Sequence, residues 1–543
     1  MKTLIGAVLL LLMAVPVRAT DYYVDASWTG TQSGTAAAPW RLRSAINWTT
    51  VATALTTDNV TIYFSSRDRW DDAGTLTIAA TGSVSFALLL DGHSKYNLVD
   101  SGTTSWLAET IPIGTKDDPC TTGRATFGSS TNHSGGIYIG HNTRAYLTLY
   151  GFCMDQPVYG ISIGPGTGHG AHDVHHVTVD SNYVNAPTNA EGQGIYGGDL
   201  TYNVHDLIVS RNIIANNHKE CIYIGQYNFF AGGADKVAPP SADAQCTNAP
   251  SGCQDSLTGN VIEYNVCLNA GGGQEGDIDI KPGNYGAIVR YNESYSTGTG
   301  TSLACIIASA SAMQIYGNYC HGQIAADPGD GGSGIQINAD GDGETNEHAT
   351  VGGSIYNNVF AANAQKGIFI VANLANVSLD LIANNTFVSN GQAGITANVT
   401  AGRAVTITSL TNNLFATNSA VSGTTELNLA SGTTVTSADH NLFYHPAGAT
   451  FINYGGSSRT WTQWQQTLGF DGNGVNADPQ LNAAYRLQGG SPAIGAGQDL
   501  SATFTVDIRQ VLRSVPWDIG ADEYAAGGGF RELRRGIPLP GDQ

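Results

Sequence analysis

Residues 384–416 read NNTFVSNGQAGITANVTAGRAVTITSLTNNLFA, and this stretch contains one full period of the pattern that decides the fold. An asparagine returns in similar phrases, and the steps from Asn358 to Asn441 are 27, 28 and 28 residues. The complete series is Asn182, Asn212, Asn265, Asn292, Asn318, Asn358, Asn385, Asn413 and Asn441. A repeat of this length indicates structural units that stack on one another and bury a continuous core.

A second series of short apolar phrases has the same period. Examples are GISI from Gly160, CIYI from Cys221, DIDI from Asp277 and GIFI from Gly367. These phrases alternate in polarity and have glycine or asparagine at their corners, so each unit consists of short β-strands and not of paired helices. We therefore predict an all-β fold in which successive turns of the chain form a parallel β-helix.

Two steps in the asparagine series are long and locate insertions. The step from Asn212 to Asn265 is 53 residues, and the step from Asn318 to Asn358 is 40 residues. Loops that project from a solenoid commonly crowd one face, and that face is often the binding face.

The ends of the chain differ from the repeats. Residues 1–19, MKTLIGAVLLLLMAVPVRA, resemble a secretory signal peptide and are too short to span a membrane, so we expect a secreted protein, extracellular or periplasmic, without membrane insertion. Exposed ends of a β-helix need caps, and helical spacing from Pro39 to about Leu55 predicts a helical N-terminal cap. The predicted boundaries are 20–75 for the cap and first strands, 76–445 for the β-helix, 446–524 for a C-terminal closing segment and 525–543 for a flexible tail.

Acidic side chains dominate the charge. The chain has 24 Lys and Arg against 44 Asp and Glu, a net charge of −20. Such a surface repels nucleic acid and anionic membranes, and it also repels acidic sugars unless cations or a local basic patch intervene. We therefore expect no nucleic-acid partner.

Eight cysteines suit an oxidising compartment. Cys246 and Cys253 share the long insertion and are the predicted disulfide. Two other pairs occupy equivalent positions two coils apart, namely Cys221 with Cys305 and Cys267 with Cys320. At about 4.8 Å per coil, two coils exceed the reach of a disulfide, so buried thiols are predicted there.

The two ends of the mature chain carry a family resemblance. The opening YYVDASWTGTQSGTAAAPWRLRSAI and the closing DPQL, YRLQGGSPAIGAG and WDIGADEY are similar to the ends of secreted bacterial right-handed β-helix proteins with a choice-of-anchor C-terminal region. This resemblance covers most of residues 21–524 and implies a right-handed β-helix of the pectate-lyase-like superfamily. The group includes polysaccharide lyases of the pectate-lyase type.

The segment GGGQEGDIDIKPGNYGAIVRYN, residues 271–292, contains an unusual cluster of charges. Ile278 and Ile280 should face the core, so strand alternation should send Asp277, Asp279 and Lys281 outward. Glu275 stands just before these residues, and Glu220 is expected beside them on the preceding coil. Clustered carboxylates suit a hard cation such as Ca²⁺, so the predicted metal ligands are Glu220, Glu275, Asp277 and Asp279.

This cluster is similar to the calcium and lysine arrangement of pectate lyases with this fold. By that resemblance, Lys281 would abstract a proton from a uronate, and Arg290 would bind the substrate carboxylate. The match is incomplete, because Lys219 and Tyr223 stand on the preceding coil where further carboxylates are expected. The alternative interpretation is a solvated ladder of surface ion pairs without chemistry.

Three other segments bear on function. Tyr196, Tyr223 and Tyr227, with Lys219, are candidates for binding the substrate, since stacked rings could form a platform for sugars; ordinary solenoid stacking is the alternative. Asn338, Asp340 and Asp342 in NADGDGETNEH could form a second calcium site, although a plain polar loop is the alternative. HGAHDVHH, residues 169–176, could bind zinc or form a coil corner. Gly168–Gly170 spells GHG, which resembles a motif of polygalacturonase-type hydrolases of this fold, but there it follows the paired aspartates and here it precedes the acidic cluster.

We therefore predict a secreted enzyme that degrades a polysaccharide, specifically a calcium-dependent lyase that cleaves a uronate-containing polymer by β-elimination. A non-catalytic glycan-binding surface or matrix protein is the first alternative. A glycoside hydrolase, which needs two carboxylates across a sugar, is the second. The expected partner is an acidic polysaccharide, and the protein is expected to be a monomer.

Overall fold

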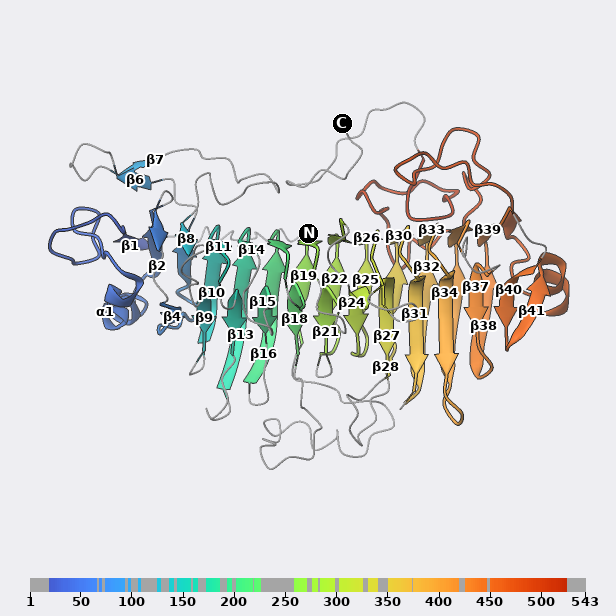
Figure 1. Ribbon diagram of the computed structural model, residues 1–543, viewed down its shortest axis with the longest axis horizontal. Coiled ribbons are helices and arrows are strands. Elements are labelled where there is room, and N and C mark those ends of the chain that lie inside the picture. The colour runs from blue at the N-terminus through green and yellow to red at the C-terminus, as the bar shows by residue number, and fades with distance from the viewer. Residues whose placement is uncertain are drawn as a thin grey trace, which may run out of the picture.

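The computed structural model describes most of the chain from residue 19 to residue 524. The described ranges are 19–65, 68–70, 74–92, 96–98, 106–108, 125–127, 136–140, 144–157, 160–164, 172–185, 193–197, 202–217, 219–225, 258–270, 276–281, 284–297, 302–325, 331–339, 350–373, 375–418, 425–446 and 450–524. Three long sheets run side by side along an elongated molecule (Figure 1). In the described residues, no helix is long and apolar enough to cross a membrane.

Sheet 1 contains the longest strands, and all its pairings are parallel. Its strands are β1 (Ala19–Val24), β2 (Asn59–Phe64), β5 (Leu88–Asp91), β10 (Arg144–Tyr150), β13 (His172–Asp180), β16 (Tyr202–Ser210), β19 (Val261–Glu263), β22 (Ile288–Arg290), β25 (Gln314–Tyr316), β28 (Thr350–Val351), β29 (Ser354–Tyr356), β32 (Val377–Ala383), β35 (Val405–Thr411) and β38 (Thr433–Asp439).

Sheet 2 follows sheet 1 on every coil, and its strands are mostly three residues long. They are β3 (Arg69–Trp70), β8 (Thr126–Phe127), β11 (Cys153–Asp155), β14 (Tyr183–Asn185), β17 (Ile213–Ala215), β20 (Val266–Leu268), β23 (Glu293–Tyr295), β26 (Tyr319–His321), β30 (Val359–Ala361), β33 (Thr386–Val388), β36 (Leu414–Ala416), β39 (Leu442–Tyr444) and β42 (Val475–Asn476).

Sheet 3 completes each coil. Its strands are β4 (Leu76–Ile78), β9 (Ile137–Ile139), β12 (Ile161–Ile163), β15 (Ile195–Gly197), β18 (Ile222–Ile224), β21 (Ile278–Ile280), β24 (Ala304–Ala308), β27 (Ser333–Asn338), β31 (Lys366–Ala372), β34 (Ala393–Val399), β37 (Leu427–Leu429), β40 (Thr450–Tyr454) and the antiparallel β41 (Ser457–Thr460). A separate antiparallel pair consists of β6 (Tyr96–Leu98) and β7 (Trp106–Ala108).

Identical side chains stack inside the solenoid. Isoleucines pair from coil to coil along sheet 3, and the rings of Phe360, Phe387, Phe415 and Phe443 stack along sheet 2 with centroid separations of 5.2, 4.8 and 4.7 Å. These phenylalanine rings are fully buried. Parallel strands joined by crossovers are right-handed almost without exception. The predicted all-β, right-handed parallel β-helix is confirmed.

The recurring asparagines line the corner between sheets 1 and 2. The residue before each of them has a positive φ, for example +57° at Ser181 and +54° at Asn357, which turns the chain sharply. Each asparagine donates its backbone N–H and side-chain Nδ2 to the side-chain oxygen of the next one, as Asn292 does to Asn318 at 3.0 Å for both bonds. The series ends at Asp471, whose Oδ1 accepts both bonds from Asn441. A carboxylate only accepts hydrogen bonds, so Asp471 ends the series in which each asparagine donates to the next.

The N-terminal helix is shorter than the sequence predicted. The helix α1 (Trp48–Ala54) begins after Asn47, whose side chain accepts a hydrogen bond from the Thr50 N–H at 3.1 Å. A short 3₁₀ turn, η1 (Arg43–Ala45), precedes it, and Pro39 lies outside both. The reason is that Asn47 supplies the N-cap acceptor that a first helical turn requires. The helix lies at the N-terminal end of the solenoid (Figure 1).

The segment after β41 begins with a helical turn, η2 (Gln463–Thr467), and from β42 onward folds back over the outer side of sheet 2 (Figure 1). The asparagine doublets of three coils hold it. Asn357 donates to the Val506 carbonyl at 2.7 Å, Asn384 donates to the Asp518 and Gly520 carbonyls at 3.0 Å, and Asn412 donates to the Gln498 carbonyl at 2.8 Å. The first asparagine of each doublet thus binds this closing segment, while the second belongs to the buried series.

The described cysteines differ in part from the prediction. Cys305 and Cys320 form a disulfide with a Cα–Cα distance of 5.8 Å, so the expectation of free thiols at these two positions is wrong. Their proximity arises because Cys305, near the start of β24 in sheet 3, faces Cys320, the middle residue of the sheet-2 strand β26 on the next coil. Cys221 and Cys267 are buried free thiols, as predicted. Cys246 and Cys253 lie outside the described residues.

Candidate functional site

The outer face of sheet 3 carries a single row of side chains. In each short strand the two flanking residues face the core and the middle residue faces outward. For example, the buried Ile195, Ile222 and Ile278 pair with one another on successive strands, so the residues that follow them share the outer face. The row runs, in strand order, through Tyr138, Ser162, Tyr196, Tyr223, Asp279, Ile307, Gln336 and Phe369. We call these residues the outer row.

Two of the predicted substrate-binding tyrosines are neighbours in this outer row. The rings of Tyr196 and Tyr223 stack with a centroid separation of 5.0 Å and an interplanar angle of 27°. Tyr196 is half-buried, whereas Tyr223 is buried. Tyr227 lies outside the described residues, and Lys219 is half-buried just before β18.

Lys281 and Asp279 form an ion pair beside these rings. The Lys281 Nζ lies 3.1 Å from Asp279 Oδ2 and 5.6 Å from the centroid of the Tyr223 ring. The side chain of Lys281 is 8% exposed and that of Asp279 is 0% exposed, so both are buried. Gly225, with a φ of +140°, makes this packing possible, since a Cβ there would lie 2.6 Å from the Cβ of Lys281. The structure thus brings together Tyr196, Tyr223, Asp279 and Lys281.

Asp277 does not face outward as strand alternation predicted. Its Oδ2 accepts hydrogen bonds from the Ser294 hydroxyl and from Gln323 Nε2, the latter at 2.8 Å. The expectation failed because Asp277 stands at the corner before β21, where the side chain turns toward the next coil of sheet 2. Burial raises the pKa of Asp277 to about 7, although the bonds from Ser294 and Gln323 oppose the shift.

Asp277 leads to a prediction about pH. A carboxyl whose pKa is raised from 3.8 to about 7 holds its proton more tightly in the folded state, so it stabilises the fold below pH 4 and loses that contribution as the pH rises through 7. We expect the melting temperature to fall between pH 5 and pH 8 and Asp277→Asn to flatten that fall. Differential scanning calorimetry across this range measures it. An unchanged pH profile in the variant would contradict the assignment.

Of the other predicted metal ligands, the structure describes Glu220 and Asn338. Glu220 is 2% exposed and stands at the corner before β18, where its carbonyl accepts a hydrogen bond from Asn217. Asn338 accepts a hydrogen bond from Gln336 at 2.9 Å. Glu275, Asp340 and Asp342 lie outside the described residues. Among the described residues no group of three or more His, Cys, Asp or Glu could hold a metal ion.

These described groups do not by themselves supply the six to eight oxygen ligands that calcium takes. Asp277 turns toward Ser294 and Gln323 at the corner before β21, whereas Asp279 belongs to the outer row. Calcium therefore stays a prediction.

Arg290 belongs to sheet 1 and not to the outer row. Its Nε donates to Glu263 Oε2 at 2.7 Å, and its Nη1 donates to the Tyr316 hydroxyl at 2.8 Å. The side chain is one-third exposed. The structure thus pairs Arg290 with a carboxylate of its own sheet, in contact with neither Lys281 nor the stacked tyrosines in any bond described.

A second polar cluster lies on the outer face of sheet 2, and the sequence analysis missed it. His321 Nε2 lies 3.2 Å from Glu293 Oε1, and its ring stacks on Tyr319 with a centroid separation of 4.0 Å. The sequence held a signal for this cluster. The residue after the series asparagine is Tyr, Ile, Val, Thr or Leu on the other coils, and only at Glu293 is it charged.

Comparisons with known proteins concern the fold. No protein-family model matches the sequence, and no curated protein matches it. A crystal structure of pectate lyase Pel9A aligns with 94% of this chain and 98% of its own, at 15% identity and a TM-score of 0.44. A GH136 lacto-N-biosidase from Eubacterium ramulus aligns with 80% of this chain and 65% of its own, at 12% identity and a TM-score of 0.46. XylC, solved with xylose, aligns with 85% of this chain and 87% of its own, at 11% identity and a TM-score of 0.37.

Similarity at this level carries no argument about activity.

Proposed function

We propose that this chain is an exported carbohydrate-active protein that holds an acidic polysaccharide along the outer row and cleaves it by β-elimination, with Lys281 as the proton acceptor. The observation that supports the proposal is the contact of the Lys281–Asp279 pair with the stacked tyrosines. Aromatic rings bind the faces of sugars, and a lysine next to them is positioned to meet a uronate. The Cys305–Cys320 disulfide suits an oxidising compartment and so supports export.

The elimination needs one base and one departing oxygen. The uncharged amine of Lys281 would take the proton next to the uronate carboxylate, and the electrons of that C–H bond would form the new C=C bond as the glycosidic C–O bond breaks. The departing oxygen then takes a proton from water. Burial favours the uncharged amine, whereas Asp279 favours the ammonium, so the reaction requires Asp279 to move away from Lys281 when substrate binds.

Non-catalytic glycan binding is the second candidate. The observation that favours it is the burial of the Lys281–Asp279 pair, because a covered ion pair with mutually satisfied charges can be structural. In that case the stacked tyrosines would contribute affinity and no bond would break.

A screen of acidic polysaccharides, with and without Ca²⁺, tests the proposal. Elimination is expected to produce an unsaturated uronate that absorbs in the near ultraviolet. New reducing ends without that absorbance would indicate hydrolysis, and binding without either product would indicate the non-catalytic alternative; both would contradict the proposed elimination. Chelation in the same assay tests the calcium prediction. Tyr196→Ala is expected to weaken binding to the polymer, and Tyr444→Ala, a half-buried tyrosine on sheet 2, is the control.

A further inference from the structure

Cys221 and Cys267 are the two described cysteines with free thiols, and their side chains are in contact. Cys221 stands directly before β18 in sheet 3, and Cys267 is the middle residue of β20 in sheet 2. Both side chains are fully buried, and a hydrogen bond joins the two thiols. The other described cysteines, which are Cys153, Cys305 and Cys320, are disulfide-bonded. Two touching thiols therefore lie in a chain that forms disulfides elsewhere.

The two positions recur in register on three successive coils. In sheet 3, the residue directly before an inward isoleucine is in turn Cys221, Asp277 and Cys305. In sheet 2, the middle residue of the strand is in turn Cys267, Ser294 and Cys320. We call the two residues that one coil supplies to these positions its bridging pair.

Each bridging pair is in direct contact. Cys305 and Cys320 are joined by a disulfide, with their Cα atoms 5.8 Å apart. Asp277 accepts a hydrogen bond from the Ser294 hydroxyl. The thiol pair one coil earlier has the same register, so its Cα atoms have the same relation as those of the disulfide. Disulfides span Cα separations of ~4.4–6.8 Å, so this relation allows a bond without movement of the backbone.

We propose that Cys221 and Cys267 are the reduced form of a further buried disulfide, which closes when the chain folds in the presence of a disulfide oxidant such as oxidised glutathione. The Cys221 thiolate attacks one sulfur of the oxidant, and the first thiol of the oxidant leaves. The Cys267 thiolate then attacks the Cys221 sulfur, forms the new S–S bond and releases the second thiol. The two cysteines lose two protons and two electrons, and the disulfide of the oxidant takes up both.

Burial places this exchange during folding. In the folded protein, burial raises the pKa of both thiols, and the nearby Asp277 carboxylate adds to both shifts. The thiolate is the reactive form of cysteine, so the enclosed dithiol reacts slowly with any reagent. The exchange therefore takes place before the coil closes over the two sulfur atoms. Once formed, the bond is protected from reductants by the same burial.

The bond constrains the coil that carries the long insertion. It links β18 to β20, and the insertion lies between these two strands in the sequence. The strand β18 also holds Tyr223 of the outer row. The disulfide therefore fixes the base of the insertion and the stacked tyrosine, whether or not the chain cleaves a polymer.

Peptide mapping without reduction tests the bond. The full chain is unfolded with dithiothreitol, refolded in a mixture of reduced and oxidised glutathione, unfolded again with iodoacetamide and digested. A linked peptide that joins Cys221 to Cys267 is expected in most molecules, and the Cys305–Cys320 peptide in the same digest is the positive control. Alkylation of both Cys221 and Cys267 in protein that contains the Cys305–Cys320 link would overturn the proposal. A link from either cysteine to any other would overturn it as well.

Melting temperatures separate the bond from packing. Cys267→Ser is the variant of choice, because serine occupies the same position on the next coil, at Ser294. Without reductant, this variant should melt about 3 °C or more below the unaltered protein, since it lacks one cross-link. With dithiothreitol the gap should shrink, because reduction opens the bond in the unaltered protein and opens Cys305–Cys320 in both. An equal gap in the two conditions would overturn the proposal.

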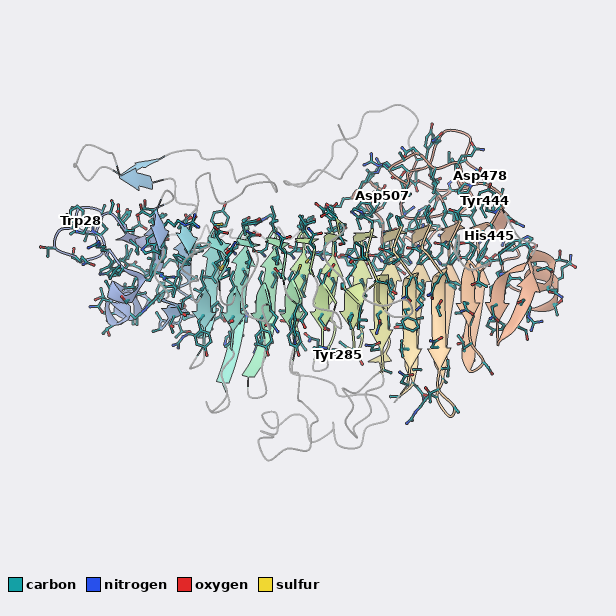
Figure 2. The ribbon with its side chains drawn as sticks, in the orientation of Figure 1. Trp28, Tyr285, Tyr444, His445, Asp478 and Asp507 are labelled. Carbon is teal, nitrogen blue, oxygen red and sulfur yellow. A yellow bond between two sulfur atoms is a disulfide. The ribbon has the colours of Figure 1, made fainter. Side chains whose placement is uncertain are left out.

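A surface variant is the matched control for these measurements. Tyr285 is 38% exposed and lies on the side of the molecule opposite Asp507 and the closing segment (Figure 2). Tyr285→Ala should differ from the unaltered protein by the same amount with and without dithiothreitol. A gap that shrinks equally for this variant would show that the redox effect does not come from Cys267. Lys281→Met should leave the linked peptide unchanged, so failure of the elimination and failure of the disulfide are distinguishable.

Discussion

Replacing Asn318 with alanine is expected to lower the free energy of unfolding by about 3–5 kcal/mol. The Asn318 side-chain oxygen accepts the Asn292 backbone N–H and the Asn292 Nδ2, both at 3.0 Å. Its own Nδ2 donates to the Val289 carbonyl at 2.9 Å and to Asn358 Oδ1 at 3.0 Å. Alanine removes all of these bonds and leaves buried donors and acceptors without partners, far from water. Urea denaturation followed by circular dichroism measures the change.

Two further variants sharpen this test. Asn398→Ala removes an exposed asparagine in β34 and should change stability by less than about 0.5 kcal/mol. Asn318→Asp keeps one acceptor but places a second oxygen against the Val289 carbonyl and Asn358 Oδ1, so it should also destabilise the fold at neutral pH. If Asn318→Ala were as stable as Asn398→Ala, the buried series would not be what holds the coils together at this corner.

Replacing Lys281 with methionine is expected to have two effects. Stability should fall by about 3–5 kcal/mol, because the buried carboxylate of Asp279 loses the cation that lies 3.1 Å away. Elimination activity, where present, should fall by about 10²–10⁴, the range for loss of a positioned base. Denaturation and the ultraviolet assay measure these independently.

The double variant Asp279→Asn with Lys281→Met separates the two roles. Removing both charges should restore most of the lost stability, since no buried charge is left alone, but it should not restore activity. Lys366→Met is the matched control, because Lys366 is also buried on sheet 3, with its Nζ 4.1 Å from the Phe369 ring centroid and 2.6 Å from Gln365 Oε1. Full elimination activity in Lys281→Met would show that the proton acceptor is another group.

The fold could be predicted from the sequence because its code is repetitive. An inward isoleucine or a corner asparagine has the same surroundings on every coil. Each repeat therefore predicts the same geometry, and an ambiguous coil can be interpreted by comparison with the others. The outward directions of Asp279 and Lys281 followed from alternation along DIDIK. Alternation failed at Asp277, because the strand has not yet begun there and the corner directs the side chain inward.

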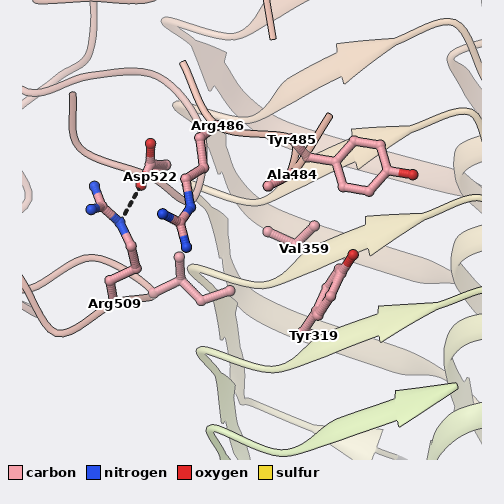
Figure 3. Close-up of a pocket in the computed structure, with 8 residues that line it drawn as sticks. Tyr319, Val359, Ala484, Tyr485, Arg486, Arg509 and Asp522 are labelled. Atoms are coloured by element: carbon pink, nitrogen blue, oxygen red, sulfur yellow. Dashed lines mark hydrogen bonds and ion pairs between the residues drawn. The ribbon is translucent and has the colours of Figure 1, made fainter. Parts of the chain in front are cut away.

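Contacts between different positions of neighbouring coils were harder to foresee. Cys305 and Cys320 are 15 residues apart and belong to different sheets. Comparing the same position on successive coils therefore could not predict that these two cysteines are in contact. The same applies to the packing of Tyr485 beside Tyr319 and Val359 (Figure 3), which occurs only because residues after β42 return over coils far earlier in the chain. The doublets beginning at Asn357, Asn384 and Asn412 were visible in the sequence, but their bonds to the closing segment were not.

The sequence by itself determined the solenoid, its inward side chains and the row that faces outward on sheet 3, since these depend on period and alternation along one chain. Only the tertiary structure decided which charges are buried, which cysteines pair and where the closing segment packs. The physical reason is that burial and pairing depend on how far one coil is turned against the next and on where a non-repeating segment docks. The length of the repeat determines neither the rotation between coils nor the docking position of the closing segment.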